Sequence, residues 1–257
     1  MLQWLPLLAV PIIGGYLLWG KYRSRQRGPA VARFASQHSL SYSAAGYVDS
    51  PGYDFPLLRA GDHCGYENVL AGRWQGLPVK EADYWWYTTM GTGHTEASRP
   101  YFSIVVADLA ATMPYVSVQA KDMLTRAFEH VGLPTLPDIS FESADVIGFE
   151  PEDFNQKFQV AASDEEFAIK LIDAGMIGWL LSTGGEFAFE VGGCNLLVSC
   201  GQLPVTGLVR LFDAAKGFVD HIPHVVWAEY GDQGANSHDG GPPGTDGTNG
   251  PPQHPRP

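Results

Sequence analysis

Residues 154–200 constrain the fold more than any other stretch, because the patterns of a strand, a helix and two further strands follow one another there. Phe154, Phe158 and Val160 are separated by polar residues, which is the alternation of a half-buried strand. The residues Ser163–Glu166 then have the form of a capping box, in which a serine hydroxyl and a glutamate carboxylate each bind a free backbone amide. We therefore expect a strand that ends near Val160 and a helix that starts at the serine.

Glycine marks both the interior and the end of this helix. Gly175 and Gly178 each cost about 1 kcal/mol relative to alanine inside a helix. The sequence therefore predicts a break between Asp173 and Met176, with a second short helix after it. The pair Gly184–Gly185 is predicted to end the helical region.

The remaining periodic segments predict an α+β fold, with a mostly antiparallel sheet and helices packed on one face, preceded by one transmembrane helix. A tight turn at Gln75–Gly76 is predicted to join two strands into a hairpin. The expected strands outside 154–160 are 67–74, 77–87, 101–109, 116–118, 186–190 and 195–200. The expected helices outside 163–182 are 27–39, 122–131 and 203–222, and a loop is expected over 43–61.

The chain divides by composition into five parts. The sequence does not decide whether the two α+β parts form one domain or two similar units that meet near residue 140. The parts are a transmembrane helix at 2–20, a basic juxtamembrane segment with a short helix at 21–42, a first α+β part of strand hairpins and a helix at 43–140, a second α+β part of strand, helix, two strands and helix at 141–230, and a disordered Gly/Pro-rich tail at 231–257.

The apolar stretch 2–19 carries no charged residue and is long enough to cross a bilayer. As a helix it reaches roughly 27 Å at about 1.5 Å per residue. The alternatives are a cleaved signal peptide and a buried helix. A signal peptide has its basic residues before the apolar run, whereas here they follow it. The sequence therefore favours a retained membrane anchor.

The basic residues Lys21, Arg23, Arg25 and Arg27 follow the apolar stretch at once. Lysine and arginine close to a span resist translocation, so we expect a single-pass protein of the cell membrane with its amino terminus outside and its soluble domain in the cytoplasm. The same four side chains are candidates for contact with anionic lipid headgroups. The three cysteines agree with a reducing compartment, because a small odd number argues against a disulfide framework.

Charge excludes one class of partner. The formal net charge is -12, although the segment next to the apolar stretch is basic. A body this acidic repels phosphate backbones, so nucleic acid is not an expected partner. The expected partners are the membrane and a protein.

One family resemblance rests on the residues of the central stretch. The quoted segments are Phe154-x-x-x-Phe158-x-Val160, 164–173, 179–181, 187–190 and 196–198. They resemble a group of uncharacterised bacterial membrane-anchored proteins of the domain-of-unknown-function type. The resemblance implies one or two membrane spans joined to a soluble α+β domain, and it implies no catalytic residue.

Signatures of known chemistry are missing from the sequence. There is no Gly-x-Ser-x-Gly elbow, no phosphate-binding loop, no His-Glu-x-x-His and no Cys-x-x-Cys motif, so no catalytic residue, metal ligand or cofactor is assigned. His221 and His224 have a spacing that two metal ligands can use, but Pro223 disrupts the helix that would align them. Cys64 follows His63, and adjacency in sequence does not supply the geometry of a nucleophile and its base.

The most unusual surface candidate is the run of four aromatic residues Tyr84, Trp85, Trp86 and Tyr87. Alternate members of a strand face opposite sides, so one pair packs inward and the other needs a second layer, a partner, a lipid or a ligand. Coverage by the loop 43–61 is the structural alternative to binding.

Three functions remain in order of preference. The first is a membrane-tethered, non-enzymatic accessory or interaction domain facing the cytoplasm. The second is a binding domain for an apolar small molecule or lipid that uses the 84–87 strand. The third is an enzyme of unrecognised type, which titratable groups converging in a cleft would favour.

Overall fold

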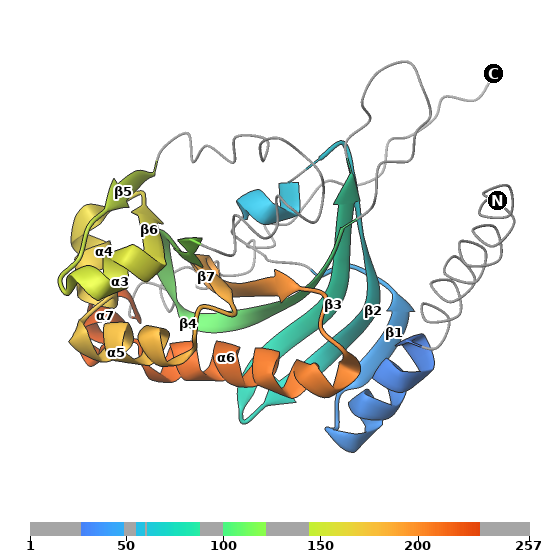
Figure 1. The fold of residues 1–257 in the computed structure, drawn as a ribbon. Coiled ribbons are helices and arrows are strands. Elements are labelled where there is room, and N and C mark those ends of the chain that lie inside the picture. The colour runs from blue at the N-terminus through green and yellow to red at the C-terminus, as the bar shows by residue number, and fades with distance from the viewer. Residues whose placement is uncertain (1–26, 49–54, 60, 88–99, 122–143, 232–257) are drawn as a thin grey trace, which may run out of the picture.

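A seven-stranded antiparallel sheet forms the centre of the computed structural model, which describes residues 27–48, 55–59, 61–87, 100–121 and 144–231 (Figure 1). The main path of the sheet runs β1-β2-β3-β4-β6-β5, and β7 pairs with β4 outside this path. The strands are β1 Ser41–Ala45, β2 His63–Trp74, β3 Leu77–Tyr87, β4 Tyr101–Ala120, β5 Asp145–Ile147, β6 Phe158–Ala162 and β7 Ala188–Gly201. The predicted α+β class is therefore confirmed.

The longest strand, β4, joins the two halves of the sheet. β3 pairs with its front half, β6 pairs with its rear half, and β7 pairs along almost its whole length, from Phe102 opposite Gly201 to Val118 opposite Phe189. The prediction of separate strands at 101–109 and 116–118 was wrong. Pro114 interrupts the sequence pattern between them, and the structure accommodates it where the register of β4 and β7 is irregular.

The two strands expected at 186–190 and 195–200 are also one strand, β7. Gly193 lies opposite Met113 at the irregularity, and its φ of 56° is in the left-handed region that glycine adopts without strain. The strand therefore passes through the interruption instead of ending there.

The helices are 27–37, α3 Glu152–Lys157, α4 Glu165–Leu171, α5 Ala174–Ser182, α6 Leu208–Asp220 and α7 His224–Tyr230. The strand predicted to begin at Phe154 is wrong, because α3 holds Phe154 and the strand β6 begins only at Phe158. A spacing of four residues between Phe154 and Phe158 puts them on one side of either a helix or a strand. It places both rings in the same core, where their centroids are 5.2 Å apart.

Two helices follow β6, and an aspartate caps the start of each. Ser163 was expected as the cap, but its hydroxyl accepts a hydrogen bond from the amide of Tyr115, and Asp164 accepts from the amide of Phe167 instead. The predicted break is confirmed, although it falls slightly earlier than expected. α4 ends at Leu171, and Asp173 caps α5 by accepting from the amide of Met176.

The front hairpin matches its prediction closely. Gln75 and Gly76 both have positive φ, 48° and 86°, as a tight two-residue turn between twisted strands requires. The expected loop over 43–61 is wrong at its start and near its end. Residues Ser41–Ala45 form the edge strand β1, and Pro56–Arg59 form a short 3-10 helix, η1.

Two apolar clusters lie on opposite faces of the sheet. The larger one contains residues of the helix 27–37 and of α6, and the rings of Phe34 and Phe212 from these helices stack with centroids 6.1 Å apart. The smaller one lies on the other face and includes Phe55, Tyr84 and Trp86. The larger cluster extends from Val31 to Val226, so one core serves both predicted α+β parts.

Some sequence predictions lie outside the described residues. They are the span 2–20, the basic residues Lys21, Arg23 and Arg25, the helix 122–131 and the tail beyond residue 231. None of the helices in the described ranges has the length and apolar character that crossing a membrane requires.

Candidate functional site

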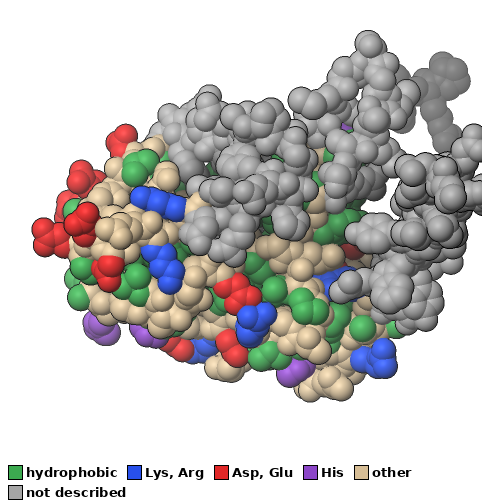
Figure 2. Space-filling model, viewed as in Figure 1, with side chains coloured by type: hydrophobic (Ala, Val, Ile, Leu, Met, Phe, Trp, Pro, Cys, Tyr) green, Lys and Arg blue, Asp and Glu red, His purple; other side chains and the backbone are tan. Residues whose placement is uncertain are grey.

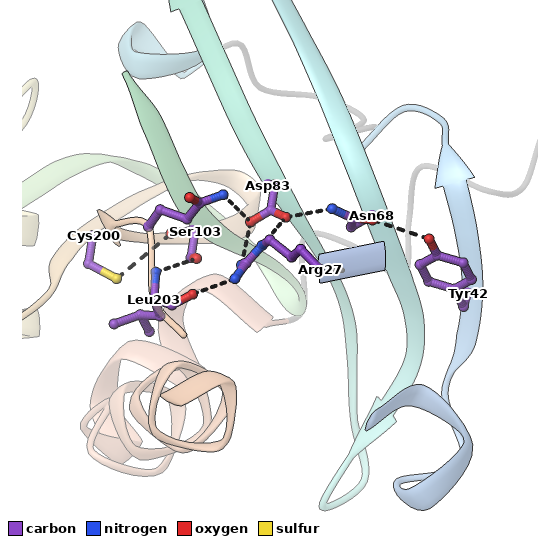
Figure 3. A network of polar contacts seen from close by, with 8 residues as sticks. Arg27, Tyr42, Asn68, Asp83, Ser103, Cys200 and Leu203 are labelled. Atoms are coloured by element: carbon purple, nitrogen blue, oxygen red, sulfur yellow. Dashed lines mark hydrogen bonds and ion pairs between the residues drawn. The ribbon is translucent and has the colours of Figure 1, made fainter. Parts of the chain in front are cut away.

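A buried ion pair fixes the beginning of the described chain to the middle of the sheet (Figure 3). The guanidinium of Arg27 donates from Nε and Nη2 to the two carboxylate oxygens of Asp83, and both contacts are 2.6 Å long. Asp83 is 1% exposed, and the Arg27 side chain is 14% exposed. The bidentate geometry is the strongest arrangement available to these two groups, and it fixes orientation as well as distance.

Neutral groups make the remaining hydrogen bonds to this ion pair. Asn68 Nδ2 donates to Asp83 at 2.8 Å, and Gln202 Nε2 donates to it at 3.3 Å. The remaining nitrogen of Arg27, Nη1, donates to the carbonyl oxygen of Leu203 at 2.7 Å. The cluster therefore links the helix 27–37, the strands β2 and β3, and the segment that follows β7 (Figure 3).

A second acid, Glu81, lies two residues before Asp83 on the same side of β3 and is 1% exposed. Burial raises the pKa of Glu81 well above its usual value, and the negative charge of Asp83 adds to this effect, while Arg27 opposes it. The oxygen Oε2 of Glu81 has no hydrogen-bond partner among the described residues. A protonated Glu81 leaves one negative and one positive charge in the cluster, so the buried charges balance.

The four predicted aromatic residues divide between the two faces of β3. Tyr84 and Trp86 are 0% and 3% exposed and belong to the smaller apolar cluster. The hydroxyl of Tyr84 donates to the carbonyl oxygen of Leu57 in η1 at 3.0 Å. The described residues Phe55, Leu57 and Leu58 of the expected 43–61 loop pack in this cluster, in line with the structural alternative that the sequence left open.

Trp85 and Tyr87 occupy the other face and are half-buried. Their ring centroids are 6.0 Å apart with nearly parallel planes, and the ring of Tyr87 stacks in turn on that of His63 in β2, at 4.8 Å. The indole of Trp85 lies against the backbone of Gly65, where a Cβ atom would come within 2.6 Å of it, so only glycine fits beneath the ring.

A further buried acid lies on the same face of the sheet as Tyr84. Glu190 in β7 accepts a hydrogen bond of 2.8 Å from the hydroxyl of Tyr115 in β4. Burial raises the pKa of Glu190 to about 7, although the bond from Tyr115 acts in the opposite direction. This group is poised to change its charge near neutral pH.

The residues considered for metal or thiol chemistry do not come together. In the described ranges no group of three or more His, Cys, Asp or Glu side chains is arranged to hold a metal ion. His221 stacks on Trp179 with ring centroids 5.1 Å apart. Cys64 is exposed, whereas burial raises the pKa of Cys200 to about 12 and keeps that thiol protonated.

Sequence reasoning missed the buried acids, and it assigned Arg27 to lipid headgroups. The structure gives the Arg27 guanidinium an internal partner, Asp83, 56 residues away along the chain. A signal was present, because Glu81 and Asp83 continue the alternate positions of Leu77 and Val79 along one strand. A buried acid is either paired with a cation or kept neutral by protonation, and Asp83 and Glu81 show one case each.

The fold defined by these elements is an α+β domain built on one bent antiparallel sheet. No family model matches the chain, and no curated protein matches it. Among solved structures, the crystal structure of the mycobacterial trehalose monomycolate transport factor A, TtfA, has a similar fold, with a TM-score of 0.54. The similarity covers 77% of this chain and 97% of that chain at 14% sequence identity, so it concerns the fold alone.

Proposed function

We propose that this chain is a membrane-tethered, non-enzymatic accessory or interaction domain that faces the cytoplasm. The observation that carries the proposal is the bidentate ion pair between Arg27 and Asp83. Arg27 is the last of the four basic residues that follow the apolar stretch 2–19. A tether that enters the domain through a buried ion pair holds the domain in a defined orientation at the membrane.

The basic residues after the apolar stretch also bear on which side of the membrane the domain lies. Lys21, Arg23 and Arg25 remain as candidates for contact with anionic lipid headgroups, each contributing about 1 kcal/mol near the surface. Arg27 serves the domain instead. The basic run after the apolar stretch favours an outside amino terminus and a cytoplasmic domain.

Two likenesses support an accessory role. The motif in residues 154–200 resembles uncharacterised bacterial proteins that are anchored in the membrane. The fold resembles that of a protein described as a transport factor for trehalose monomycolate. By analogy of fold alone, we propose that this chain assists a membrane transport process and does not itself convert a substrate.

The second candidate function is binding of an apolar small molecule or lipid through the 84–87 strand. The half-buried rings of Trp85 and Tyr87 favour it, because tryptophan and tyrosine combine a large apolar area with a polar atom. Tyr84 and Trp86 are packed inside the domain and would serve such a site only as its support.

Topology reporters test the first proposal. The full chain is fused at its carboxyl terminus either to alkaline phosphatase, which is active only after export, or to a fluorescent protein that folds in the cytoplasm. We expect membrane-bound, fluorescent protein and little phosphatase activity. High phosphatase activity with a dark fluorescent fusion would contradict the cytoplasmic orientation, and recovery of the chain without membranes would contradict the tether.

A matched variant shows whether the apolar stretch carries the attachment. Leu8→Lys together with Ile12→Lys places two charges near the centre of the stretch, where each costs about 3 kcal/mol for insertion. We expect this variant to leave the membrane fraction. Ile169→Lys with Val225→Lys adds the same charges at two exposed apolar positions of α4 and α7 and should leave membrane attachment unchanged.

A further inference from the structure

We propose that two copies of this chain associate through the edge strand β1, which pairs antiparallel with the β1 of the partner and joins the two sheets into one. The partner is a second copy of the chain, related to the first by a two-fold axis. Three features support this contact: the open edge of the sheet, the side chains of β1 and the distribution of charge. The inference goes beyond the proposed function and does not depend on the membrane tether.

The strand β1 is at one end of the sheet, and among the described residues it pairs with β2 alone. Alternate residues of an antiparallel strand direct their amide and carbonyl groups to opposite sides, so half of the backbone groups of an edge strand point away from the sheet. Four of the five residues in Ser41–Ala45 are exposed. The outer backbone groups of β1 are therefore accessible to another strand.

The side chains of β1 leave this edge unobstructed. Natural sheets protect an edge with charged residues, proline or a bulge. The strand has neither a charged residue nor proline, and its register with β2 is regular. Its one large side chain, Tyr42, is held over β2, because its hydroxyl donates to Oδ1 of Asn68 at 3.2 Å (Figure 3). The other four side chains are small, since they belong to serine and alanine.

The order of these side chains suits pairing of the strand with itself. A two-fold axis at Ser43 places Ser43 opposite the partner's Ser43 and Tyr42 opposite the partner's Ala44, so each large side chain meets a small one. In this register Tyr47, just beyond the strand, approaches the partner's Ser39. The ring of Tyr47 is 79% exposed in the single chain, and the second copy would cover it.

Charge favours this edge over the opposite edge of the sheet. Residues 27–48 contain no aspartate or glutamate, although the chain has a net charge of -12. Exposed acids gather instead at the end formed by β5, α3 and α4, away from β1 (Figures 1 and 2). They are Asp145, Glu150, Glu152, Asp153, Glu165 and Glu166. Pairing through β1 keeps the acidic ends of the two copies apart, whereas pairing through β5 would bring them together.

A disulfide at the two-fold axis tests this register in the full chain, purified in mild detergent. The parent protein carries Cys64→Ser and Cys194→Ser, and its remaining thiol, Cys200, is buried. Ser43→Cys is then added and the protein is oxidised with copper phenanthroline. Directly opposite residues of antiparallel strands have Cα atoms about 4.5–5.5 Å apart, which a disulfide can join. We expect most of the chain to become a covalent dimer that a reductant separates.

Two cysteine positions in the same strand provide matched controls. Ser41→Cys alone should give about tenfold less dimer, because the two Cys residues at position 41 lie roughly 13 Å apart along the strands. Ser41→Cys mixed with a differently tagged Ala45→Cys should restore the crosslink between the two kinds of chain, since these positions lie opposite each other in the proposed register.

A charge at the axis tests the association without a covalent bond. Ser43→Lys places two like charges directly opposite each other, so the dissociation constant of the dimer should rise at least about fivefold. Light scattering of the full chain in detergent measures the mass over a dilution series, and circular dichroism checks the fold. Ser182→Lys adds the same charge at an exposed position of α5 and should leave the dissociation constant unchanged.

Three results would overturn the proposal. The first is a full chain that remains monomeric at every concentration, which would leave the edge for a different protein. The second is equal crosslinking of Ser43→Cys and Ser41→Cys, and the third is a dimer that Ser43→Lys does not weaken. None of them affects the proposed function, which the topology reporters test separately.

Discussion

At the scale of single residues, Arg27 and Asp83 depend on each other. Asp83 is 1% exposed, and a carboxylate without its counter-ion in such a place is strongly disfavoured. Arg27→Gln should therefore lower the free energy of unfolding by about 3 kcal/mol, measured by urea denaturation of the full chain in detergent. The stability of Arg27→Lys should lie between those of the native chain and of Arg27→Gln, because lysine retains the charge and loses the bidentate geometry.

Arg33 supplies the matched control for this prediction. It lies in the same helix, is exposed, and its Nε donates only to the carbonyl oxygen of Pro29 among the described residues. Arg33→Gln should change stability by less than about 0.5 kcal/mol. Equal effects of the two substitutions would show that the ion pair with Asp83 contributes no more than a surface contact.

Glu190 gives a second residue-scale prediction, which concerns pH. Its pKa in the folded protein is about 7, above its usual value of 4.5. The folded state therefore holds this proton more tightly than the unfolded state, so stability is greatest below pH 4.5 and falls as the pH rises through 7. The loss is on the order of 3 kcal/mol, because each pKa unit corresponds to about 1.4 kcal/mol.

Glu190→Gln should remove this part of the pH dependence and keep the acceptor for the Tyr115 hydroxyl. Unfolding free energies at a series of pH values between 4.5 and 8 measure the difference between the two proteins, which should widen with rising pH. Glu165→Gln, at an exposed position of α4, serves as the control. Parallel curves for the native chain and Glu190→Gln would contradict the burial argument.

At the scale of secondary structure, two helical glycines should respond in opposite ways to the same substitution. A Cβ atom at Gly178 in α5 meets nothing within 4 Å, whereas at Gly217 in α6 it would lie 2.7 Å from the ring of Trp179. Gly178→Ala should raise the free energy of unfolding by about 0.5–1 kcal/mol, through the lower backbone entropy of the unfolded chain.

Gly217→Ala should instead destabilise the protein by about 1–3 kcal/mol, because the indole of Trp179 must move within its aromatic contacts. Thermal unfolding of the two variants, followed by circular dichroism, measures both effects. A stabilising Gly217→Ala would mean that α5 and α6 do not approach each other as closely as described.

The same scale shows what the sequence could predict. The hairpin of β2 and β3 followed from alternation and from Gln75–Gly76, because both signals are local. Phe154 was misassigned because a four-residue spacing fits a helix and a strand equally well. The continuity of β4 depends on β7, which is distant in sequence, so Pro114 appeared to end a strand.

The candidate site was predictable only in part for the same reason. The sequence placed Trp85 and Tyr87 opposite Tyr84 and Trp86, since alternation along a strand is local. It did not reveal Asp83 as the partner of Arg27, because that contact joins positions 56 residues apart. The buried acids were visible in the pattern of β3, but their counter-ion was not.

At the scale of the whole molecule, the shared strands predict cooperative unfolding. β4 contributes Val105 to the front half and Val118 to the rear half, and both belong to one apolar cluster. Native-state hydrogen exchange should therefore give the amides of both residues the same opening free energy, equal to that of global unfolding. A markedly lower value for Val118 would show that the rear half opens as a separate unit.

The pairing of β4 with β7 also determines when the chain can complete its fold during synthesis. Phe102 pairs with Gly201, 99 residues later, so one edge of β4 has no partner strand until the ribosome has released β7. At about 5–20 residues per second, this interval lasts on the order of ten seconds. An apolar strand with one open edge is prone to pair with other chains during that time. During that interval residues 101–120 present an unpaired strand edge of the kind that chaperones for extended apolar segments bind.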